Sequence, residues 1–326
     1  MAKINAKSLI ADIGKPVSQI ALGTASYSIA SKEEWFDILD YYVEFGGTIV
    51  DTARGYSTSE EVIGLWMENR IIRNQIIVQT KCGLTGGDGY LPAHNFPEII
   101  QEEITTSLQT LRTDYIDVLL LHRDNQEMTV AEILTPLNQE IANGRAHAIG
   151  ASNWEYRRVT EANEYAYKHG IKGFAVVSNN ISLAVPAAAF YKGLVSTDQS
   201  GERWHEETGI PLIPWSSQAR GFFTGRYTSE MIDDYARATE RDGFTNQMIK
   251  VYGTDENFAR LERATKLGDK KGGYTAVEVA LAYLLHKPFP IVPVVGPRKR
   301  EELASCVKAT SLTLTESEIK WLDLEA

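Results

Sequence analysis

Four side chains in the first half of the chain are of types that would suit proton transfer to an oxygen atom. Asp51, Tyr56, Lys81 and His122 supply a carboxylate, a phenol, an amine and an imidazole. A free phenol has a pKa of about 10, too high for an efficient acid at neutral pH, but a nearby ammonium favours the phenolate. A buried lysine needs a counter-charge, which Asp51 would provide, and His122 would hydrogen-bond a carbonyl oxygen. The group predicts protonation of an oxygen while a hydride reaches the neighbouring carbon.

The first two of these residues flank a strand-to-helix turn. The β-branched run at 48–50 predicts a buried strand that ends at Asp51. Gly55 permits a turn before Tyr56. Residues 57–61 then supply an N-cap and acidic first-turn residues for a helix that continues to about Arg70.

Lys81 and His122 end the next two strand-like segments, at residues 75–81 and 115–122. Each of the four residues, taken singly, is more often structural than functional. Four of them at or just beyond the ends of three consecutive strands are a much rarer coincidence. In a parallel barrel the carboxyl ends of the strands share one face, so we expect the four side chains to meet in one pocket.

Strand-like and helix-like segments alternate along almost the whole sequence, which predicts a parallel sheet covered by helices. The expected strands are residues 17–22, 48–50, 75–81, 115–122, 146–151, 174–178, 211–216 and 291–295. The expected helices are 31–45, 57–70, 98–111, 129–143, 155–169, 229–239, 257–266, 299–307 and 316–323, with Thr315 as the N-cap of the last.

Eight such units predict a (β/α)8 TIM barrel in the α/β class, with a doubly wound open sheet as the second choice. An N-terminal β-hairpin is expected from residues 8–13 and 17–22, which flank Gly14-Lys15-Pro16. Residues 180–209 and 218–274 are too long for simple connections and predict extended loops over the barrel mouth. We expect one domain over residues 1–326.

The bulk composition excludes several classes of protein. The 326 residues carry 33 basic and 43 acidic side chains, so the net charge is 33 − 43 = −10, which disfavours binding to nucleic acid or to an anionic membrane surface. Two cysteines exclude a disulfide framework and make a cysteine metal site improbable, and no metal is expected. The first residues lack the apolar core of a signal peptide, and no run approaches 18 apolar residues. We expect a soluble, cytoplasmic protein of undetermined oligomeric state.

Seven short motifs occur in the order found in one family of barrel enzymes. They are Leu22-Gly23-Thr24-Ala25, Asp51-Thr52-Ala53-Arg54-Gly55-Tyr56, Thr80-Lys81, Leu120-Leu121-His122, Ile149-Gly150-Ala151-Ser152-Asn153, Pro214-Trp215-Ser216 and Val295-Gly296-Pro297-Arg298. Together they resemble the aldo-keto reductase superfamily, from about residue 17 to the end of the chain.

This resemblance implies a reductase of aldehyde, ketone or open-chain sugar carbonyls that uses NADPH without a Rossmann domain. It implies that Tyr56 is the general acid, Lys81 the cation that makes Tyr56 a usable acid, Asp51 the partner of Lys81, and His122 the residue that orients the carbonyl. The absence of G-x-G-x-x-G after a strand and of G-x-x-x-x-G-K-[ST] is consistent with such a cofactor site.

The same resemblance implies which residues hold the cofactor. The nicotinamide would lie against Trp215, with its carboxamide held by Ser152 and Asn153. The phosphates would lie near Arg298 and the N-terminus of the last barrel helix, where backbone N–H groups favour anions. The other cofactor-binding candidates are Gly23, Thr24, Asp51, Ser178, Ser216, Gly221, Gly296 and Glu302.

Four positions depart from the family's pattern. Ser178 stands where Gln is common, Ile181 where Tyr or a similar residue is common, Cys306 where Asn is common, and Glu302 where some branches have a basic residue. Arg298 and the two basic residues after it would compensate, so NADPH is expected and NADH remains possible.

We expect Tyr27, Tyr56, His122 and Trp154 to contact a small carbonyl substrate. Residues 25–27 lack the indole that some family members have there, which predicts a roomier pocket floor. Trp154 would add an apolar wall.

Two neighbours of the four central residues are expected to be structural. Arg54 would bridge to Glu60, and Cys82 would pack behind its strand because adjacent strand residues face opposite sides.

Other functions remain open on this fold. The same fold also serves in cofactor-binding regulatory subunits of ion channels, in which turnover would be slight. A Schiff-base lyase would need a neutral Lys81, which Asp51 disfavours. A glycosidase would need two carboxylates flanking a bond, and only Asp51 is well placed.

Overall fold

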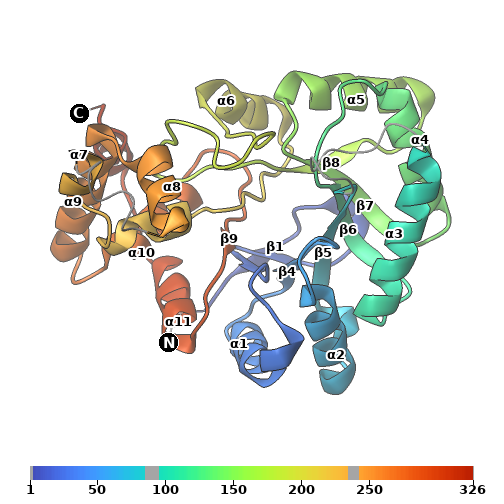
Figure 1. Cartoon of the computed structure of the whole chain (residues 1–326), viewed down its shortest axis with the longest axis horizontal. Helices are drawn as coiled ribbons and strands as arrows, with labels where there is room; N and C mark the ends of the chain where they lie inside the picture. Colours follow the sequence, from blue (N-terminus) through green and yellow to red (C-terminus); the bar gives the residue numbers. More distant parts are fainter. Residues whose placement is uncertain (1–2, 85–94, 234–241, 326) are drawn as a thin grey trace.

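A curled parallel sheet forms the centre of the protein in the computed structural model, which describes residues 3–84, 95–233 and 242–325. Seven strands lie side by side in the order β8-β7-β6-β5-β4-β3-β9, and every neighbouring pair is parallel (Figure 1). Their bounds are β3 Ala21–Gly23, β4 Ile49–Asp51, β5 Ile77–Cys82, β6 Ile116–Leu121, β7 Ala146–Ser152, β8 Phe174–Ser178 and β9 Val294–Val295.

The eighth position of the barrel is occupied by residues 211–214, which join the two ends of this sheet. Leu212 forms parallel bridges to Val177 of β8 and to Ile291, just before β9. The N–H of Ile213 donates to the carbonyl of Val177 at 2.8 Å. The chain is therefore a (β/α)8 barrel, as the alternation predicted.

Prolines explain why the last two strands are irregular. Pro211 and Pro214 flank the bridging residues, and Pro290 and Pro293 interrupt the neighbouring segment that leads into β9. A proline has no backbone N–H to donate to a ladder. The expected strand at 211–216 is thus reduced to isolated bridges, and the one at 291–295 to the two residues of β9.

An antiparallel hairpin precedes the barrel, but its arms differ from those expected. β1 (Ala6–Lys7) pairs with β2 (Val17–Ser18). The expected first arm at 8–13 is wrong, because Ala11–Ile13 forms a 3₁₀ helix that ends at left-handed Gly14. The expected second arm at 17–22 divides into β2 and the first barrel strand.

The hairpin region fills the amino-terminal end of the barrel. Ile10, Ile13 and Val17 belong to the same buried apolar cluster as the inward-facing strand residues Ile49 and Ile77. This end is packed with side chains, which leaves the carboxyl ends of the strands as the face available for a site.

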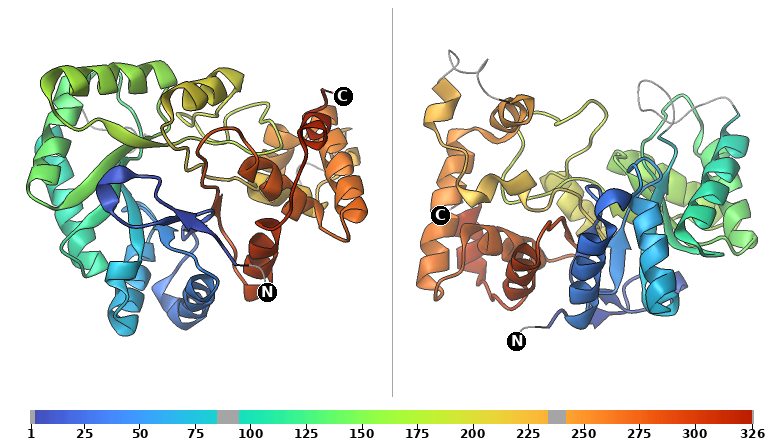
Figure 2. Two further views of the ribbon diagram at one scale, coloured as in Figure 1. Left: turned by 180° about the vertical axis from the view of Figure 1, so that it is seen from behind. Right: turned by 60° about the horizontal axis from the view of Figure 1, so that its bottom comes forward.

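Helices cover the outside of the sheet (Figure 2). Their bounds are α1 Lys32–Glu44, α2 Ser59–Arg70, α3 Phe96–Leu111, α4 Val130–Ala142, α5 Tyr156–His169, α6 Gln199–Thr208, α7 Glu230–Asp233, α8 Gly243–Tyr252, α9 Asp255–Lys270, α10 Ala276–Leu285, α11 Arg300–Ala309 and α12 Glu316–Leu322. Thr315 caps α12 as expected, since its side chain accepts from the N–H of Glu318. Part of the helix expected at 229–239 lies outside the described residues.

Three helices, α6, α8 and α10, lie in segments where no helix was expected. α10 has apolar residues on nearly all sides, so it shows no amphipathic period, and most of its residues are buried. Its start does carry a sequence signal, a capping box between Thr275 and Glu278. Within the described ranges, no helix has the length and hydropathy needed to cross a membrane.

Candidate active site

A buried ion pair lies at the carboxyl ends of β4 and β5. The amine of Lys81 donates to Asp51 Oδ1 at 2.6 Å and to the carbonyl of Thr52 at 2.8 Å. Lys81 is 2% exposed and Asp51 4%, so neither charge is hydrated by bulk water. Burial alone would lower the pKa of Lys81, but Asp51 and the Tyr56 hydroxyl outweigh it and raise that pKa. The amine is therefore a cation at neutral pH.

A third strand residue, which the sequence argument missed, completes this pair. Gln79 Nε2 donates to Asp51 Oδ1 at 2.7 Å, and its side chain is fully buried. Gln79 precedes Lys81 by two residues on β5, so both side chains point to the same face of the strand. Counting back by two from Lys81 would have identified it.

Tyr56 stands over the ion pair. The amine of Lys81 lies 5.0 Å from the centroid of the Tyr56 ring. His122 meets the same ring edge-on, with 5.7 Å between ring centroids and 81° between the ring planes. The structure thus brings the four predicted residues into one cluster at the ends of consecutive strands.

The turn that carries Tyr56 is held in place by backbone hydrogen bonds and an ion pair. The N–H of Arg54 donates to the carbonyl of Lys81 at 2.9 Å, and the N–H of Tyr56 donates to that of Ala53 at 3.0 Å. The Arg54 guanidinium pairs with buried Glu60 at 3.0 Å, which confirms the expected structural bridge. Glu60 also accepts from Thr80, the residue before Lys81.

His122 is held neutral. Burial, followed by the charges of Lys81 and Arg123, keeps the pKa of His122 well below its usual range. Its Nδ1 is buried and has no hydrogen-bond partner in the described structure. A neutral ring with an unused nitrogen fits a group that contacts a ligand. Asn153 Nδ2 donates to the His122 carbonyl at 3.2 Å and so ties β7 to this position.

Cys82 faces away from this cluster. It is 2% exposed among apolar side chains, and burial raises the pKa of its thiol well above the usual range. The expectation that it packs behind the strand is confirmed.

A cavity of about 1470 Å³ opens above the four residues. Its lining includes all but one of the expected cofactor-binding residues, namely Gly23, Thr24, Asp51, Ser152, Asn153, Trp215, Ser216, Gly221, Gly296, Arg298 and Glu302. The exception, Ser178, is 1% exposed and outside the lining, although its carbonyl accepts from the Ser152 hydroxyl at 2.9 Å.

Two residues expected to contact substrate lie in the core instead. Tyr27 is 2% exposed and stacks on Trp35 with 4.3 Å between ring centroids. Trp154 is fully buried and meets Phe174 edge-on at 5.0 Å. Neither lines the cavity, so both expectations are corrected. Their large apolar rings gain more from core packing than from an open pocket.

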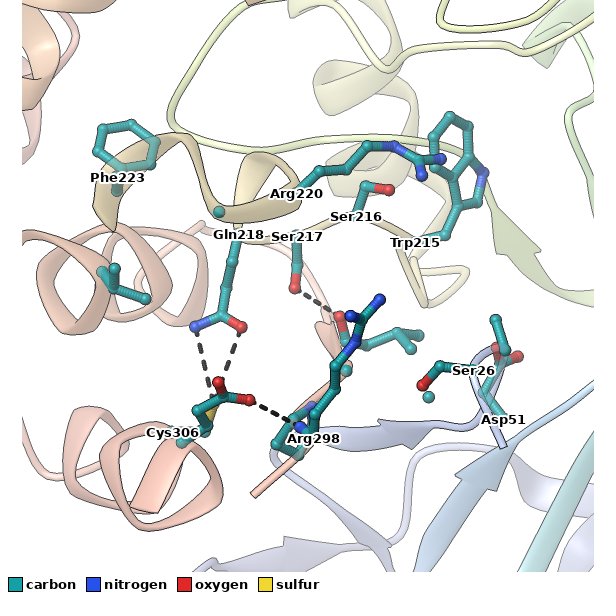
Figure 3. A pocket seen from close by; sticks show the side chains of 18 of the residues that line it. Ser26, Asp51, Trp215, Ser216, Ser217, Gln218, Arg220, Phe223, Arg298 and Cys306 are labelled. Carbon is teal, nitrogen blue, oxygen red and sulfur yellow. Dashed lines mark hydrogen bonds between the residues drawn. The ribbon is translucent and has the colours of Figure 1, made fainter. Parts of the chain in front are cut away.

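One end of the cavity is bounded by the first turn of α11. The N–H of Arg298 donates to Glu302 Oε2 at 2.7 Å, and the Arg298 side chain projects into the cavity (Figure 3). The N-cap residue Lys299 provides no side-chain cap, which leaves helix N–H groups available. Arg300 is engaged elsewhere, by an ion pair with Asp37.

The segment at 215–226 forms the opposite wall and contributes residues that the sequence argument did not name. Gln218 exchanges weak hydrogen bonds with Cys306 of α11 at 3.6 and 3.8 Å. Ser217 donates to the Val294 carbonyl at 2.6 Å, which fastens the wall to β9. Figure 3 shows Arg220 extending from this wall toward Trp215.

The chain is a (β/α)8 barrel with this cluster of side chains at the carboxyl face of its strands, and comparison with known proteins identifies its family. The model of the aldo/keto reductase family matches residues 19–324, so the chain belongs to this family.

Its curated relatives carry oxidoreductase names. A norsolorinic acid reductase from Aspergillus flavus is 30% identical, over 97% of this chain and 79% of the relative. Norsolorinic acid reductase B from Dothistroma septosporum is 27% identical, over 98% of this chain and 81% of its own length. An NADP(+) aryl-alcohol dehydrogenase from Phanerodontia chrysosporium is 28% identical, over 97% and 84% respectively.

Proposed function

We propose that this protein is an NADPH-dependent reductase of small carbonyl compounds, with Tyr56 as the general acid. The observation that carries the proposal is the buried Lys81–Asp51 pair beneath the Tyr56 ring, open to a large cavity. The names of the relatives, which refer to an aryl alcohol and to norsolorinic acid, favour aromatic carbonyl substrates.

The cavity residues fit a nicotinamide dinucleotide. Trp215 is partly exposed in the lining, and its indole Nε1 has no partner in the described structure. The cavity extends from there to Arg298 and the uncapped start of α11, whose N–H groups and dipole favour phosphate oxygens. When bound, the dihydronicotinamide supplies the hydride.

The chain's own groups would handle the proton. Tyr56 would donate its hydroxyl proton to the carbonyl oxygen, and the adjacent Lys81 cation would stabilise the phenolate left behind. Asp51 keeps Lys81 charged by opposing the effect of burial. Neutral His122 would donate an N–H to the same oxygen and so orient the carbonyl.

The other proposed roles concern cofactor binding. Ser152 and Asn153 would hold the carboxamide from the wall beside His122. Arg298 would contact the 2′-phosphate, while Glu302 accepts from the Arg298 N–H and places a negative charge nearby. This balance supports NADPH as the preferred cofactor and leaves NADH usable.

Reduction of benzaldehyde, followed through the absorbance of NADPH, tests the proposal. Tyr56→Phe removes only the hydroxyl and is expected to lower kcat by at least ~100-fold, the usual size of a general-acid contribution. Cofactor affinity, measured by quenching of tryptophan fluorescence, should be unchanged. If the wild-type protein binds NADPH but turns over no aldehyde or ketone, it acts as a cofactor-binding regulatory subunit, and the reductase proposal fails.

A further inference from the structure

Arg220 is a cation at the cavity wall, and the described part of the chain gives it no acidic partner. It lines the cavity and is only partly buried. Within residues 3–84, 95–233 and 242–325 no carboxylate pairs with it, and its buried Nε has no hydrogen-bond acceptor. A buried guanidinium N–H without an acceptor is costly, and such groups recur where a ligand provides the acceptor.

The backbone holds this side chain in a strained conformation. Ala219, Arg220 and Gly221 have consecutive positive φ angles of 46°, 51° and 86°. Only the last is a glycine, and a left-handed conformation costs an ordinary residue on the order of 1 kcal/mol or more. Such strain is characteristic of functional sites, and here it directs Arg220 into the cavity.

Two aromatic rings flank the guanidinium. Its carbon lies 4.1 Å from the centroid of the Phe190 ring and 5.9 Å from that of Trp215. Phe190 in turn contacts Tyr191 at 5.0 Å and Phe244 at 5.9 Å between ring centroids. Tyr191 and Phe244 are 59% and 45% exposed, and both line the cavity. Flat apolar walls beside a planar cation match a flat ring that carries an anion.

The residues proposed to hold the cofactor phosphates lie elsewhere in the cavity. Arg298 and the start of α11 lie on the other wall of the cavity, whereas Arg220 extends toward Trp215 (Figure 3). Trp215 is also the residue proposed to contact the nicotinamide, next to which the carbonyl must bind. Arg220 would therefore stand beside the reacting part of the ligand.

We propose that Arg220 binds a carboxylate on the carbonyl substrate, so that the preferred substrates are aromatic aldehydes or ketones bearing an acid group. This inference rests on the proposed function, because it names the substrate class of the same site. The guanidinium fork binds a carboxylate through two parallel N–H···O hydrogen bonds, while its face stays on Phe190. The carboxylate would supply the acceptor that Nε lacks.

Two matched pairs of substrates test the assignment. The pairs are 4-carboxybenzaldehyde with its methyl ester, and 4′-formylbiphenyl-4-carboxylate with its methyl ester, which extends the reach. In at least one pair the wild-type KM of the acid should be lower than that of the ester by roughly 10-fold or more, the size of a charge-assisted hydrogen bond. Arg220→Gln should abolish this preference, leave kcat and the ester KM unchanged, and leave NADPH affinity intact, whereas Arg220→Lys should retain part of the preference.

Several outcomes would overturn the assignment. If Arg220→Gln raises the KM of acid and ester alike, the side chain has only a packing role on Phe190. If it weakens NADPH binding instead, Arg220 contacts the cofactor phosphates. The absence of any acid preference in the wild-type protein would also overturn it.

A binding measurement separates this inference from the proposed function. Terephthalate carries the aromatic carboxylate but no reducible carbonyl, and its dissociation constant can be measured by calorimetry with the wild-type protein and Arg220→Gln. If no carbonyl is reduced but terephthalate binds through Arg220, the reductase proposal fails and the carboxylate site stands. If aldehydes are reduced but terephthalate binds the two proteins equally, the carboxylate site fails and the reductase proposal stands.

Discussion

The Lys81–Asp51 pair should dominate the stability of the barrel mouth, and a double-mutant cycle can measure its contribution. Removing one partner of a buried ion pair leaves an uncompensated charge, which costs about 3–5 kcal/mol. Lys81→Met leaves the Asp51 carboxylate, which is 4% exposed, without its counter-charge. Asp51→Leu does the same to the Lys81 amine, which is 2% exposed. Each single variant should therefore lose about 3–5 kcal/mol of unfolding free energy.

The double variant should lose much less unfolding free energy than the sum of the losses of the two single variants. With both charges gone, the remaining cost is that of two neutral groups, Gln79 Nε2 without its acceptor and the Thr52 carbonyl without its donor. At about 1–2 kcal/mol each, the double variant should lose about 2–4 kcal/mol, whereas additivity would give about 6–10 kcal/mol.

Urea unfolding at pH 7, followed by far-UV circular dichroism, gives all four free energies. The exposed pair Lys172–Asp12, with 2.7 Å between Nζ and Oδ1, is the matched control, and its coupling should stay below about 1 kcal/mol. Additive losses at the buried pair, or a loss under about 1 kcal/mol in Lys81→Met, would refute the argument that burial makes this pair interdependent.

Three further predictions concern turnover, cofactor choice and pH. Lys81→Met should remove most carbonyl reduction while NADPH binding, measured by fluorescence titration, stays largely intact; unchanged turnover would contradict the role of the cation beside the phenol. Arg298→Ala should weaken NADPH more than NADH, and equal weakening of both dissociation constants would show that Arg298 does not contact the 2′-phosphate. His205 is fully buried, stacks on Phe289 and contacts the Ile210 carbonyl, and burial lowers the pKa of His205 to about 4. As the pH falls, His205 stays neutral in the folded protein, whereas in the unfolded chain it has a pKa of about 6.5 and takes up a proton. The contribution of His205 to the free energy of unfolding is therefore complete above pH ~6.5 and is lost as the pH falls toward 4. Urea unfolding from pH 7 to pH 4 measures this decrease in the free energy of unfolding, and His205→Gln should make it smaller by up to about 3 kcal/mol. An unchanged dependence of the unfolding free energy on pH would count against this assignment.

The position of the central four residues could be predicted because strand ends are visible in the sequence. A β-branched run that stops at a carboxylate, as at Asp51, reports both the strand and the face at which it ends. Parallel pairing then brings Lys81 and His122 to the same face without further information. The barrel itself followed from the alternation, which the parallel register of β3 to β8 bears out.

The side chains around that centre were harder to place. Tyr27 and Trp154 are aromatic residues near strand ends, but residue type does not indicate whether a ring turns toward the cavity or toward a covering helix. Both rings turn into the core, where Trp35 and Phe174 are their partners. Only three-dimensional packing decides between the two directions.

Arg220 was missed for a different physical reason. Its direction depends on a left-handed backbone at two residues that are not glycine, and nothing in their types indicates this conformation. The strands expected at 211–216 and 291–295 were predicted too long for another reason. Their prolines are visible in the sequence, but the prediction did not allow for the backbone N–H donors that these prolines lack.

The distribution of charge in the cavity connects the two proposals. The protein has a net charge of −10, yet the cavity lining includes Lys81 and several arginines. The charge of Lys81 is balanced by Asp51 at 2.6 Å, and its amine also donates to the Thr52 carbonyl, so Lys81 attracts an anionic ligand only weakly. We propose that the anionic groups of the ligands are held by two of the arginines that line the walls, Arg298 beside α11 and Arg220 beside Trp215. It follows that raising the salt concentration should weaken binding of cofactor and acidic substrate, since these arginines are partly solvated, and should leave the proton-transfer step itself nearly unchanged, since the buried pair is screened far less.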